Sequence, residues 1–525
     1  RDTIYDEQIK IYDVQGSSSV NTITFNGESG DSSVAGLHYQ NSNPSNDFTL
    51  GLVGTHNIFF NDLTIDRSNG TYAMLIQGGA HDVTVTNSKL GGDIMSPRYS
   101  VDSVLTFVGN NMEGKNITLH HPVGTDAGKV VIENNYLRAI TLSNSSELYI
   151  NDNRGSSNLS SRCWLFKIDT CKNITLSGNR ASGIFLYSDT TINIINNNLF
   201  CDYCSSGNEA GTYSRNWSDI ISTLAIKNSH DFNLTLNNYF SNGYYLGSGI
   251  RIEQSSLGSI YQDSVYSRCN YFDLNGYYDF YRQAGGISIN GSNRIDVENN
   301  FIENYSSGGG QNGLNINYSD TIEIKKNTIF GNVNDVRNEY PGGTVGVIIR
   351  GNSEIILDSN NINNFTVSGI WDLNNDKAII TSNAIDTIFL EGVRLEGDSG
   401  VFTDNIINSI VGGNGISING NGGANVSRNK ILGVTAGSGI VVDAPNSLVA
   451  NNYVQSDGVG LAKGISLEAN GSGSDVVFNS VNVTGTDVVN GQAIAVNGGT
   501  NYRVKNNIFA NNGGGYAAYI NSDIS

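Results

Sequence analysis

The feature that most constrains this chain is a short phrase that recurs from Gly286 to the C-terminus. It reads as glycine, two apolar residues separated by one position, a polar turn, and an apolar segment that contains an asparagine. The first half occurs, for example, at residues 286–289, 415–418 and 464–467. The second half gives a column of asparagines spaced 22 to 33 residues apart: Asn300, Asn327, Asn360, Asn383, Asn405, Asn429, Asn452, Asn479 and Asn507. A recurring period of this length indicates a solenoid, in which each repeat contacts only its neighbours.

The apolar residues of the repeat alternate, which is the period of a β-strand. Ile287 and Ile289 form one such pair, and Ile295 and Val297 form the next. No window carries eleven or more residues at helical spacing. We therefore predict an all-β fold, a right-handed parallel β-helix solenoid. Each repeat is one coil of two or three short strands, and the handedness follows the rule for parallel crossovers.

The asparagine column has a structural explanation. A turn that recurs in every coil stacks its side chains about 4.8 Å apart, and an amide both donates and accepts hydrogen bonds. Asparagine also tolerates the left-handed turn conformation. We interpret the column as a hydrogen-bonded ladder and not as a binding site.

The repeat predicts one elongated domain over residues 1–525, because a solenoid grows in one dimension. Residues 1–70 form the N-terminal coils, and residues 286–525 form the regular coils. The phrase also returns upstream, at residues 131–137 and 192–197. The stretches 197–285 and 332–343 interrupt it and are interpreted as loop insertions.

The net charge of −19 and the pI near 4.6 argue against nucleic acid as a partner, because phosphate binding needs clustered Lys and Arg, and they equally disfavour anionic membrane surfaces. No apolar run reaches the roughly 18 residues of a membrane span. An acidic surface rich in Asn, Ser, Thr and Tyr suits an exported protein. The chain opens with Arg1, and we expect a processed or truncated piece of a longer protein whose export and anchoring signals lie elsewhere.

The five cysteines fall between positions 160 and 270. An oxidising compartment would allow the pairs Cys163–Cys171 and Cys201–Cys204, with Cys269 left over. Inert thiols are the alternative. A metal is disfavoured, because the single Cys-x-x-Cys has no partner motif.

The N-terminal residues resemble a known family. Tyr5, Glu7, Gln8 and Ile9, residues 21–31 and residues 57–65 look like the start of β-helix regions in large surface proteins of Bacteroidota. This resemblance implies export by the type IX system and a role in adhesion or gliding. More broadly, the coils resemble the repeats shared by pectate lyases, polysaccharide epimerases and tailspikes, which implies the fold alone.

The insertions carry the candidate binding residues, since function usually resides on loops held by a rigid scaffold. Their aromatic rings would stack on pyranose rings, while carboxylates and a guanidinium would bind the hydroxyls. The alternative is that aromatic loops merely cover an interrupted core. The candidates are Tyr213, Trp217, Asp219, Tyr277, Tyr278, Asp279, Tyr281, Arg282, Glu339 and Tyr340.

Catalytic signatures are scarce. The polygalacturonase motifs Asn-Thr-Asp and Gly-His-Gly and the epimerase motif Asp-Pro-His are absent. A lyase needs only a base and a cation near a uronate, and the cations near the insertions are Lys227, Arg251, Arg268 and Arg282. The adjacent His120 and His121 would point to opposite faces of a strand and cannot chelate one ion together.

No catalytic residue or cofactor is therefore assigned. A Ca²⁺ site on a stacked acidic face stays open as an alternative, although the Gly-Gly-x-Gly-x-Asp repeat of calcium-binding solenoids is absent. The leading hypothesis is a non-catalytic surface or adhesin segment outside the cell that binds a polysaccharide or surface glycan. The alternative is a secreted polysaccharide lyase or glycoside hydrolase acting on an acidic glycan.

Overall fold

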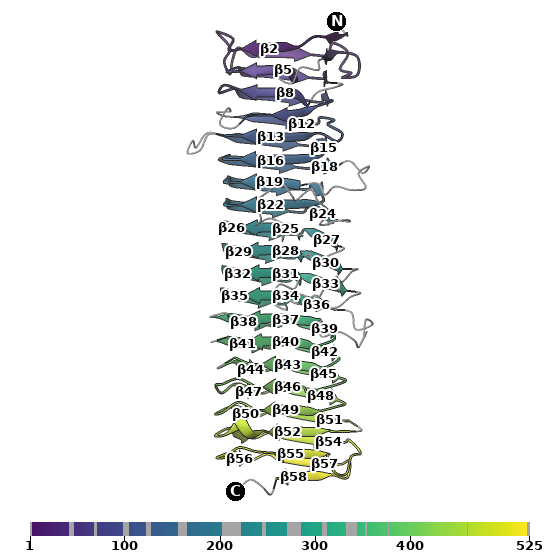
Figure 1. The fold of residues 1–525 in the computed structure, drawn as a ribbon, viewed down its shortest axis with the longest axis vertical. Helices are drawn as coiled ribbons and strands as arrows, with labels where there is room; N and C mark the ends of the chain where they lie inside the picture. The colour runs from purple at the N-terminus through teal and green to yellow at the C-terminus, as the bar shows by residue number, and fades with distance from the viewer. Residues whose placement is uncertain are drawn as a thin grey trace. The chain divides into compact units, whose positions relative to one another are not determined.

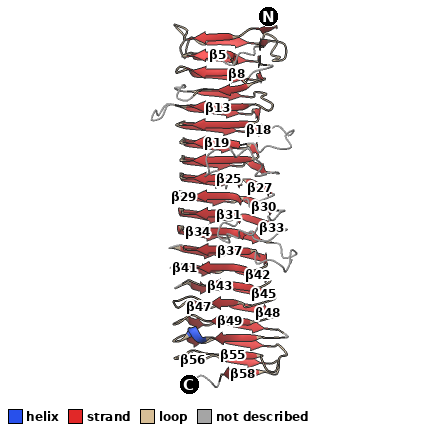
Figure 2. Cartoon of the chain, viewed as in Figure 1, coloured by secondary structure: helices blue, strands red, loops and turns tan. Residues whose placement is uncertain are grey.

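The computed structural model consists of short parallel strands wound into successive coils (Figures 1 and 2). It describes residues 3–40, 47–67, 71–97, 104–121, 128–155, 165–201, 222–243, 248–269, 285–306, 312–331, 344–351, 354–375, 377–397, 399–458 and 460–521. The chain divides into two compact units. Unit 1 comprises residues 1–204 and 223–239, and unit 2 comprises residues 205–222 and 240–525.

Most coils contribute one strand to each of three parallel sheets, which we call A, B and C. In unit 1, sheet B contains β2 (Ile9–Tyr12), β5 (Phe48–Val53), β8 (Tyr72–Gln77), β11 (Asp93–Met95), β13 (Asn116–His120), β16 (Ala139–Ser143), β19 (Leu165–Asp169), β22 (Gly183–Tyr187) and β25 (Ser222–Lys227). Sheet C contains β3 (Ile23–Asn26), β6 (His56–Asn61), β9 (His81–Thr86), β12 (Leu105–Val108), β14 (Lys129–Glu133), β17 (Glu147–Asn151), β20 (Lys172–Ser177), β23 (Thr190–Ile195) and β26 (His230–Thr235). Sheet A contains β1 (Ile4–Asp6), β4 (Gly36–His38), β7 (Thr64–Asp66), β10 (Lys89–Leu90), β15 (Tyr136–Leu137), β18 (Arg154–Gly155), β21 (Arg180–Ala181) and β24 (Asn198–Cys201).

Unit 2 repeats the same three-sheet arrangement, and β27 (Asn238–Gly243) crosses the boundary between the units. Its sheet B contains β28 (Ser248–Glu253), β31 (Gly285–Asn290), β34 (Asn312–Asn317), β37 (Val345–Arg350), β40 (Ser368–Leu373), β43 (Glu391–Leu395), β46 (Ile416–Ile418), β49 (Ser438–Val442), β52 (Lys463–Leu467), β55 (Gln492–Val496) and β58 (Tyr516–Ile520). Sheet C contains β29 (Ser256–Tyr261), β32 (Asn293–Glu298), β35 (Asp320–Lys325), β38 (Ile355–Asp358), β41 (Ala378–Thr381), β44 (Val401–Thr403), β47 (Asn425–Ser427), β50 (Leu448–Ala450), β53 (Asp475–Val477) and β56 (Arg503–Lys505). Sheet A contains β30 (Ser264–Cys269), β33 (Phe301–Ser306), β36 (Thr328–Phe330), β39 (Asn361–Phe365), β42 (Ala384–Ile388), β45 (Ile406–Ile410), β48 (Lys430–Val434), β51 (Tyr453–Ser456), β54 (Ser480–Val483) and β57 (Ile508–Asn511). The helical element of unit 2 is the 3-10 turn η3 (Ala469–Gly471).

The core of each unit is a set of stacked apolar columns. In unit 1, Ile117, Ile140 and Phe166 occupy equivalent positions of successive sheet B strands, and each is at most 3% exposed. In unit 2, Ile287 and Ile289 point inward as the alternation predicts, and both are fully buried. Inward residues of successive coils therefore pack on one another, which is the arrangement of a parallel β-helix.

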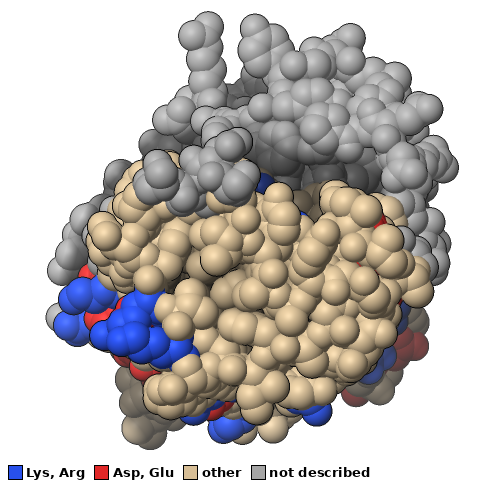
Figure 3. All heavy atoms as spheres, turned by 90° about the horizontal axis from the view of Figure 1, so that it is seen from below, with Lys and Arg blue, Asp and Glu red and all other residues tan. Residues whose placement is uncertain are grey.

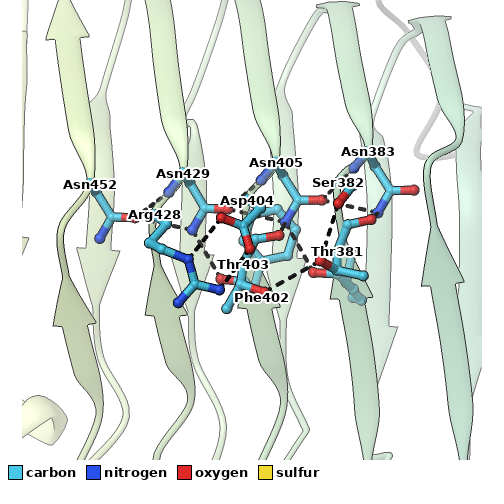
Figure 4. A network of polar contacts seen from close by, with 11 residues as sticks. Thr381, Ser382, Asn383, Phe402, Thr403, Asp404, Asn405, Arg428, Asn429 and Asn452 are labelled. Atoms are coloured by element: carbon cyan, nitrogen blue, oxygen red, sulfur yellow. Dashed lines mark hydrogen bonds and ion pairs between the residues drawn. The ribbon is translucent and has the colours of Figure 1, made fainter.

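The asparagine ladder is confirmed (Figure 4). Amides within the ladder accept two hydrogen bonds through Oδ1 from the asparagine one coil earlier; Asn405, for example, accepts the backbone N–H of Asn383 at 2.8 Å and its Nδ2 at 3.0 Å. Unit 1 has the same ladder at Asn110, Asn135, Asn153, Asn179, Asn197 and Asn237. One detail of the prediction is wrong. The left-handed residue is the one before the ladder asparagine, such as Arg428 at φ 59° or Phe478 at φ 60°, and the ladder asparagine that follows does not have a positive φ.

The interruption at residues 197–285 is narrower than predicted. Residues 222–269 form the regular strands β25 to β30, apart from residues 244–247, which lie outside the described residues. Regular strands form there because the alternation of inward apolar residues continues. The fully buried residues that continue it are Leu224 and Ile226 on β25, and Ile250 and Ile252 on β28. The predicted insertion at 332–343 lies outside the described residues.

The last described coil of unit 2 exposes apolar side chains. Val504 is 39% exposed and Ile520 is 69% exposed, although both continue inward columns of the core. In the view from below, the centre of the described surface is mostly uncharged, and charged residues of both signs lie along its left, lower and right edges (Figure 3).

Candidate functional site

All ten residues of the predicted aromatic patch lie outside the described residues. They are Tyr213, Trp217, Asp219, Tyr277, Tyr278, Asp279, Tyr281, Arg282, Glu339 and Tyr340. The patch stays a prediction, and the site described below is built from other residues.

The candidate site lies on the outer face of sheet B in unit 1, across strands β13, β16, β19, β22 and β25. Side chains of this sheet alternate between the core and the surface, so that the outward residues of successive strands form rows. We call the two outward rows together the unit 1 face. One row contains His120, Ser143, Asp169, Tyr187 and Lys227, and the other contains Thr118, Thr141, Lys167, Phe185 and Ala225.

The first three strands of the unit 1 face form a surface pocket. It is lined by His120, Thr141, Leu142, Ser143, Asn144, Lys167 and Asp169. Leu142 is buried in the core, whereas His120, Lys167 and Asp169 are half-buried. The pocket therefore combines an ammonium group, an imidazole, a carboxylate and two hydroxyl groups.

Hydrogen bonds fix the polar side chains of the pocket. His120 Nδ1 and Ser143 Oγ are joined at 2.6 Å across β13 and β16. Thr170 Oγ1 donates to Asp169 Oδ1 at 2.8 Å, and Asn144 Nδ2 donates to the carbonyl oxygen of His121 at 3.1 Å. Side chains held in this way lose little conformational entropy when a ligand binds.

An aromatic pair follows on the next strand. The rings of Phe185 and Tyr187 on β22 lie parallel, with centroids 6.5 Å apart and an interplanar angle of 12°. Phe185 is only 5% exposed and supports the half-buried Tyr187. Tyr187 directly follows Asp169 in its row, and Lys227 comes next. A polar pocket beside an aromatic ring is an arrangement that binds sugars through hydroxyl contacts and ring stacking.

The described residues of this face carry charges of both signs. Lys167 and Lys227 are positively charged, and Asp169 is negatively charged. Asp189 lies beneath Tyr187 and accepts its backbone N–H at 2.9 Å. Burial raises the pKa of Asp189 to about 8, and the backbone N–H groups of Cys171 and Tyr187 oppose this shift.

The two adjacent histidines separate as predicted. His120 lies on the outer face, whereas His121 is fully buried and its Nδ1 is 3.0 Å from Ser145 Oγ. Of the predicted cations, Lys227 belongs to the unit 1 face. Arg251 lies in unit 2, where its Nε donates to Glu253 Oε1 at 2.6 Å. The side chains of Arg268 and Arg282 lie outside the described residues.

The proposed Cys163–Cys171 disulfide is wrong, because Cys171 is a free, fully buried thiol. Its Sγ accepts the Ser145 N–H at 3.4 Å, and its own N–H donates to Asp189 Oδ1 at 2.6 Å. Cys171 thus belongs to a second ladder of turn residues, and burial raises the pKa of its thiol to about 12. The side chains of the other four cysteines lie outside the described residues.

A second outward cluster, in unit 2, is internally satisfied. The Arg394 guanidinium lies 5.0 Å from the centre of the Trp371 ring, and its Nε donates to Glu396 Oε1 at 2.5 Å. Trp371 Nε1 donates to the other Glu396 oxygen at 3.4 Å. Because the cation covers the ring and the carboxylate neutralises the cation, we do not treat this cluster as the site.

The possible metal ligands in the described part of the chain are dispersed. No three His, Cys, Asp or Glu side chains converge there in a way that would hold an ion. Calcium binding stays a prediction. Among the described residues, no helix has the length and hydrophobicity to cross a membrane.

Sequence reasoning missed His120, Ser143, Lys167, Asp169 and Tyr187 as a group. The sequence pattern that identifies this group is indirect, because residues that are neighbours across the strands are 18 to 26 positions apart along the chain. Aligning the coils by their buried positions would have placed all five in two neighbouring columns. The insertions were predicted to hold the binding residues, whereas this site lies on regular strands.

The comparison with protein families agrees with this fold. Residues 368–525 match the family described as the right handed beta helix region. The chain therefore has the fold of a right-handed parallel β-helix, as predicted. The search of curated protein sequences found no match.

Solved structures were also matched. A surface adhesin of Streptococcus pneumoniae is 11% identical, with 70% of this chain and 85% of that chain covered and a TM-score of 0.28. A periplasmic alginate epimerase is 11% identical, with 82% and 77% covered and a TM-score of 0.24. A tailspike protein of the E. coli bacteriophage HK620 in complex with a pentasaccharide is 10% identical, with 92% and 72% covered and a TM-score of 0.25. At such identities and TM-scores, these likenesses carry no argument about function.

Proposed function

We propose that this protein is a non-catalytic, extracellular carbohydrate-binding β-helix, a surface or adhesin segment that binds a polysaccharide or surface glycan. The observation that carries the proposal is the pocket on the unit 1 face, where Lys167, Asp169 and His120 surround a depression next to Tyr187. Hydroxyl-rich ligands need several donors and acceptors that converge, together with an apolar surface for the ring. This face supplies both on rigid strands.

The composition and the scaffold support a location outside the cell. An acidic chain rich in Asn, Ser, Thr and Tyr stays soluble there. The N-terminal resemblance to surface proteins of Bacteroidota adds the proposal that type IX secretion and anchoring machinery are its partners. The aromatic residues of the insertions remain a proposed second part of the binding surface.

A glycan array tests the proposal. The 525-residue chain is incubated with neutral, amino and acidic glycans, and the bound glycans are recovered and analysed by mass spectrometry. We expect binding to a restricted set of glycans, with the recovered glycans unchanged in mass. Failure to bind any glycan would contradict the proposal.

One observation favours a second candidate function, a polysaccharide lyase. A base, a cation and a carboxylate, provided by His120, Lys167 and Asp169, line the same pocket. A lyase uses such groups to remove the proton next to a uronate carboxylate and to neutralise the charge that develops. Incubation with uronate polysaccharides decides between the two functions. Growth of the absorbance of unsaturated products would establish the lyase and exclude the non-catalytic role.

A further inference from the structure

An outward row of sheet A in unit 2 places a carboxylate between aromatic rings. Strands β30, β33 and β36 follow one another in this sheet (Figure 1). Tyr266 on β30 is in register with Glu303 on β33, and Glu303 is in register with Phe330 on β36. Phe301 lies two residues before Glu303 and points to the same face of the sheet. We call these four residues the Glu303 cluster.

The Glu303 carboxylate has aromatic neighbours on three sides. Successive strands are about 4.8 Å apart, so Tyr266 and Phe330 lie one strand spacing from Glu303 on either side. Phe301 lies about 6.6 Å away along β33. A cation bound to the carboxylate can therefore come within the roughly 6 Å of a ring centre at which cation–π attraction acts.

The rings support one another and reach the surface. Tyr266 stacks on Phe240, with ring centroids 4.7 Å apart and an interplanar angle of 3°, and its ring lies 5.7 Å from that of Phe301. Phe301 is 38% exposed and Phe330 is 39% exposed, whereas Tyr266 and Glu303 are half-buried. Exposed aromatic side chains grouped around a charge are typical of an interaction surface.

The Glu303 cluster contains rings and a carboxylate but no cation. In the described part of unit 2, the Glu303 carboxylate makes neither a hydrogen bond nor an ion pair, and no Lys or Arg lies over the three rings of the cluster. A half-buried carboxylate attracts a cation more strongly than a fully solvated one, because the effective dielectric constant around it is lower. The net charge of −19 also attracts a basic partner to this chain.

Elsewhere in unit 2, an arginine of this chain completes the same combination of ring and carboxylate. The Arg394 guanidinium lies 5.0 Å from the centre of the Trp371 ring, and its Nε donates to Glu396 Oε1. The ring and the carboxylate thus bind different parts of one guanidinium group. The Glu303 cluster presents the same two groups to solvent.

Unit 1 contains the same association of a cation with a ring. The Arg67 guanidinium lies 5.3 Å from the centre of the Tyr39 ring, and its Nε lies 3.1 Å from Asp47 Oδ1. The Lys129 ammonium group lies 4.9 Å from the centre of the Tyr149 ring. A guanidinium is planar, so it can stack on a ring and still donate two parallel hydrogen bonds to a carboxylate, which an ammonium group cannot do.

We infer that the Glu303 cluster is a docking site for an arginine side chain of a partner protein. The guanidinium of the partner donates to the Glu303 carboxylate and stacks on a neighbouring ring of the cluster. This inference goes beyond the proposed function, because it concerns a protein partner and a sheet of unit 2. It does not depend on the pocket of the unit 1 face.

Fluorescence anisotropy with labelled peptides tests the inference. Three peptides alternate glycine with arginine, with lysine or with citrulline, the uncharged analogue of arginine, and each is titrated with the 525-residue chain. We expect the arginine peptide to bind about tenfold more tightly than the citrulline peptide and about threefold more tightly than the lysine peptide. The lysine peptide controls for general attraction to an acidic chain. Equal binding of the arginine peptide and either of the others would overturn the inference.

Variants locate the binding. Glu303→Gln is expected to weaken binding of the arginine peptide about tenfold, and Phe330→Leu about threefold. The matched control is Asp386→Asn, because Asp386 is half-buried in the same row but lies between Asn363 and Asn408. Circular dichroism confirms that each variant folds. An unchanged affinity in Glu303→Gln, or an equal loss in Asp386→Asn, would overturn the inference.

A second copy of this chain is the alternative source of the arginine. Sedimentation of the wild type and of Glu303→Gln over a range of concentrations separates the two sources. We expect both proteins to sediment as the same species at every concentration. Self-association of the wild type that disappears in Glu303→Gln would overturn the assignment of the site to a different protein.

Discussion

Asn429 Oδ1 accepts both the backbone N–H of Asn405, at 2.9 Å, and its side-chain Nδ2, at 3.1 Å (Figure 4). Asn405 Nδ2 also donates to the carbonyl oxygen of Ile380 at 3.0 Å. A single side chain thus connects three successive coils. The ladder explains how buried turns of a β-helix satisfy their polar groups without water.

Replacing a ladder residue should therefore destabilise unit 2 strongly. Asn405→Ala removes the acceptor of two hydrogen bonds from Asn383 and leaves those buried donors unpaired. We expect a loss of about 3 kcal/mol in the free energy of unfolding, measured by chemical denaturation. Asn421→Ala, at an exposed asparagine, is the control and should change stability by less than about 0.5 kcal/mol. Equal effects of the two substitutions would contradict the ladder's structural role.

Phe478 occupies a left-handed turn position with φ 60° and is 55% exposed. In this conformation a phenylalanine has a higher steric energy than an asparagine. Phe478→Asn should raise the free energy of unfolding by about 1 kcal/mol. The matched control is Phe330→Asn, an exposed phenylalanine within a strand, where the loss of β-propensity should destabilise. A destabilised Phe478→Asn would contradict the assigned backbone strain.

Asp372 interrupts an apolar column, between Ile349 and Leu395 of the neighbouring strands. It is 1% exposed, and burial raises its pKa to about 6. The negative charge of Glu396 raises the pKa further, whereas the hydrogen bond from Asn375 lowers it. The unfolded carboxyl titrates near 3.8. Between these values the folded protein holds a proton that the unfolded chain has lost, so stability falls as the pH rises from about 4 to about 6.

Substitution of Asp372 by leucine should remove this dependence. We expect Asp372→Leu to be more stable than the wild type at pH 8 by about 3 kcal/mol, with a smaller gain at pH 4. Denaturation across this pH range measures the difference. A gain that is the same at both pH values would show that the buried charge does not cause it.

Cys171 should be inert in the folded protein, because burial raises the pKa of its thiol to about 12 and leaves the sulfur inaccessible. Alkylation with iodoacetamide at pH 8, mapped by mass spectrometry, should leave Cys171 unmodified until denaturant is added. Labelling of Cys171 without denaturant would contradict its position in the turn ladder.

The sequence predicted the fold well because the fold is periodic. The alternation of Ile287 with Ile289 and the spacing of Asn383 from Asn405 each repeat a local rule, and every coil reinforces it. The site was harder to predict. Ser143 and Lys167 can be recognised as neighbours only when the coil lengths are known. The coil lengths of unit 1 vary, so that ladder partners are 18 to 40 residues apart. The identity of an outward residue also carries little information about the fold, because many different side chains are tolerated at solvent-exposed positions.

The measurement that tests the account most directly is the glycan-array profile of a variant whose pocket is filled. Ser143→Trp places an indole in the pocket beside His120, whereas Thr175→Trp adds the same group to the outer face of sheet C in the same unit. The account predicts that Ser143→Trp loses every signal of the wild type and that Thr175→Trp retains them. Binding that survives in Ser143→Trp, or disappears equally in both variants, would contradict the assignment of carbohydrate binding to the unit 1 face.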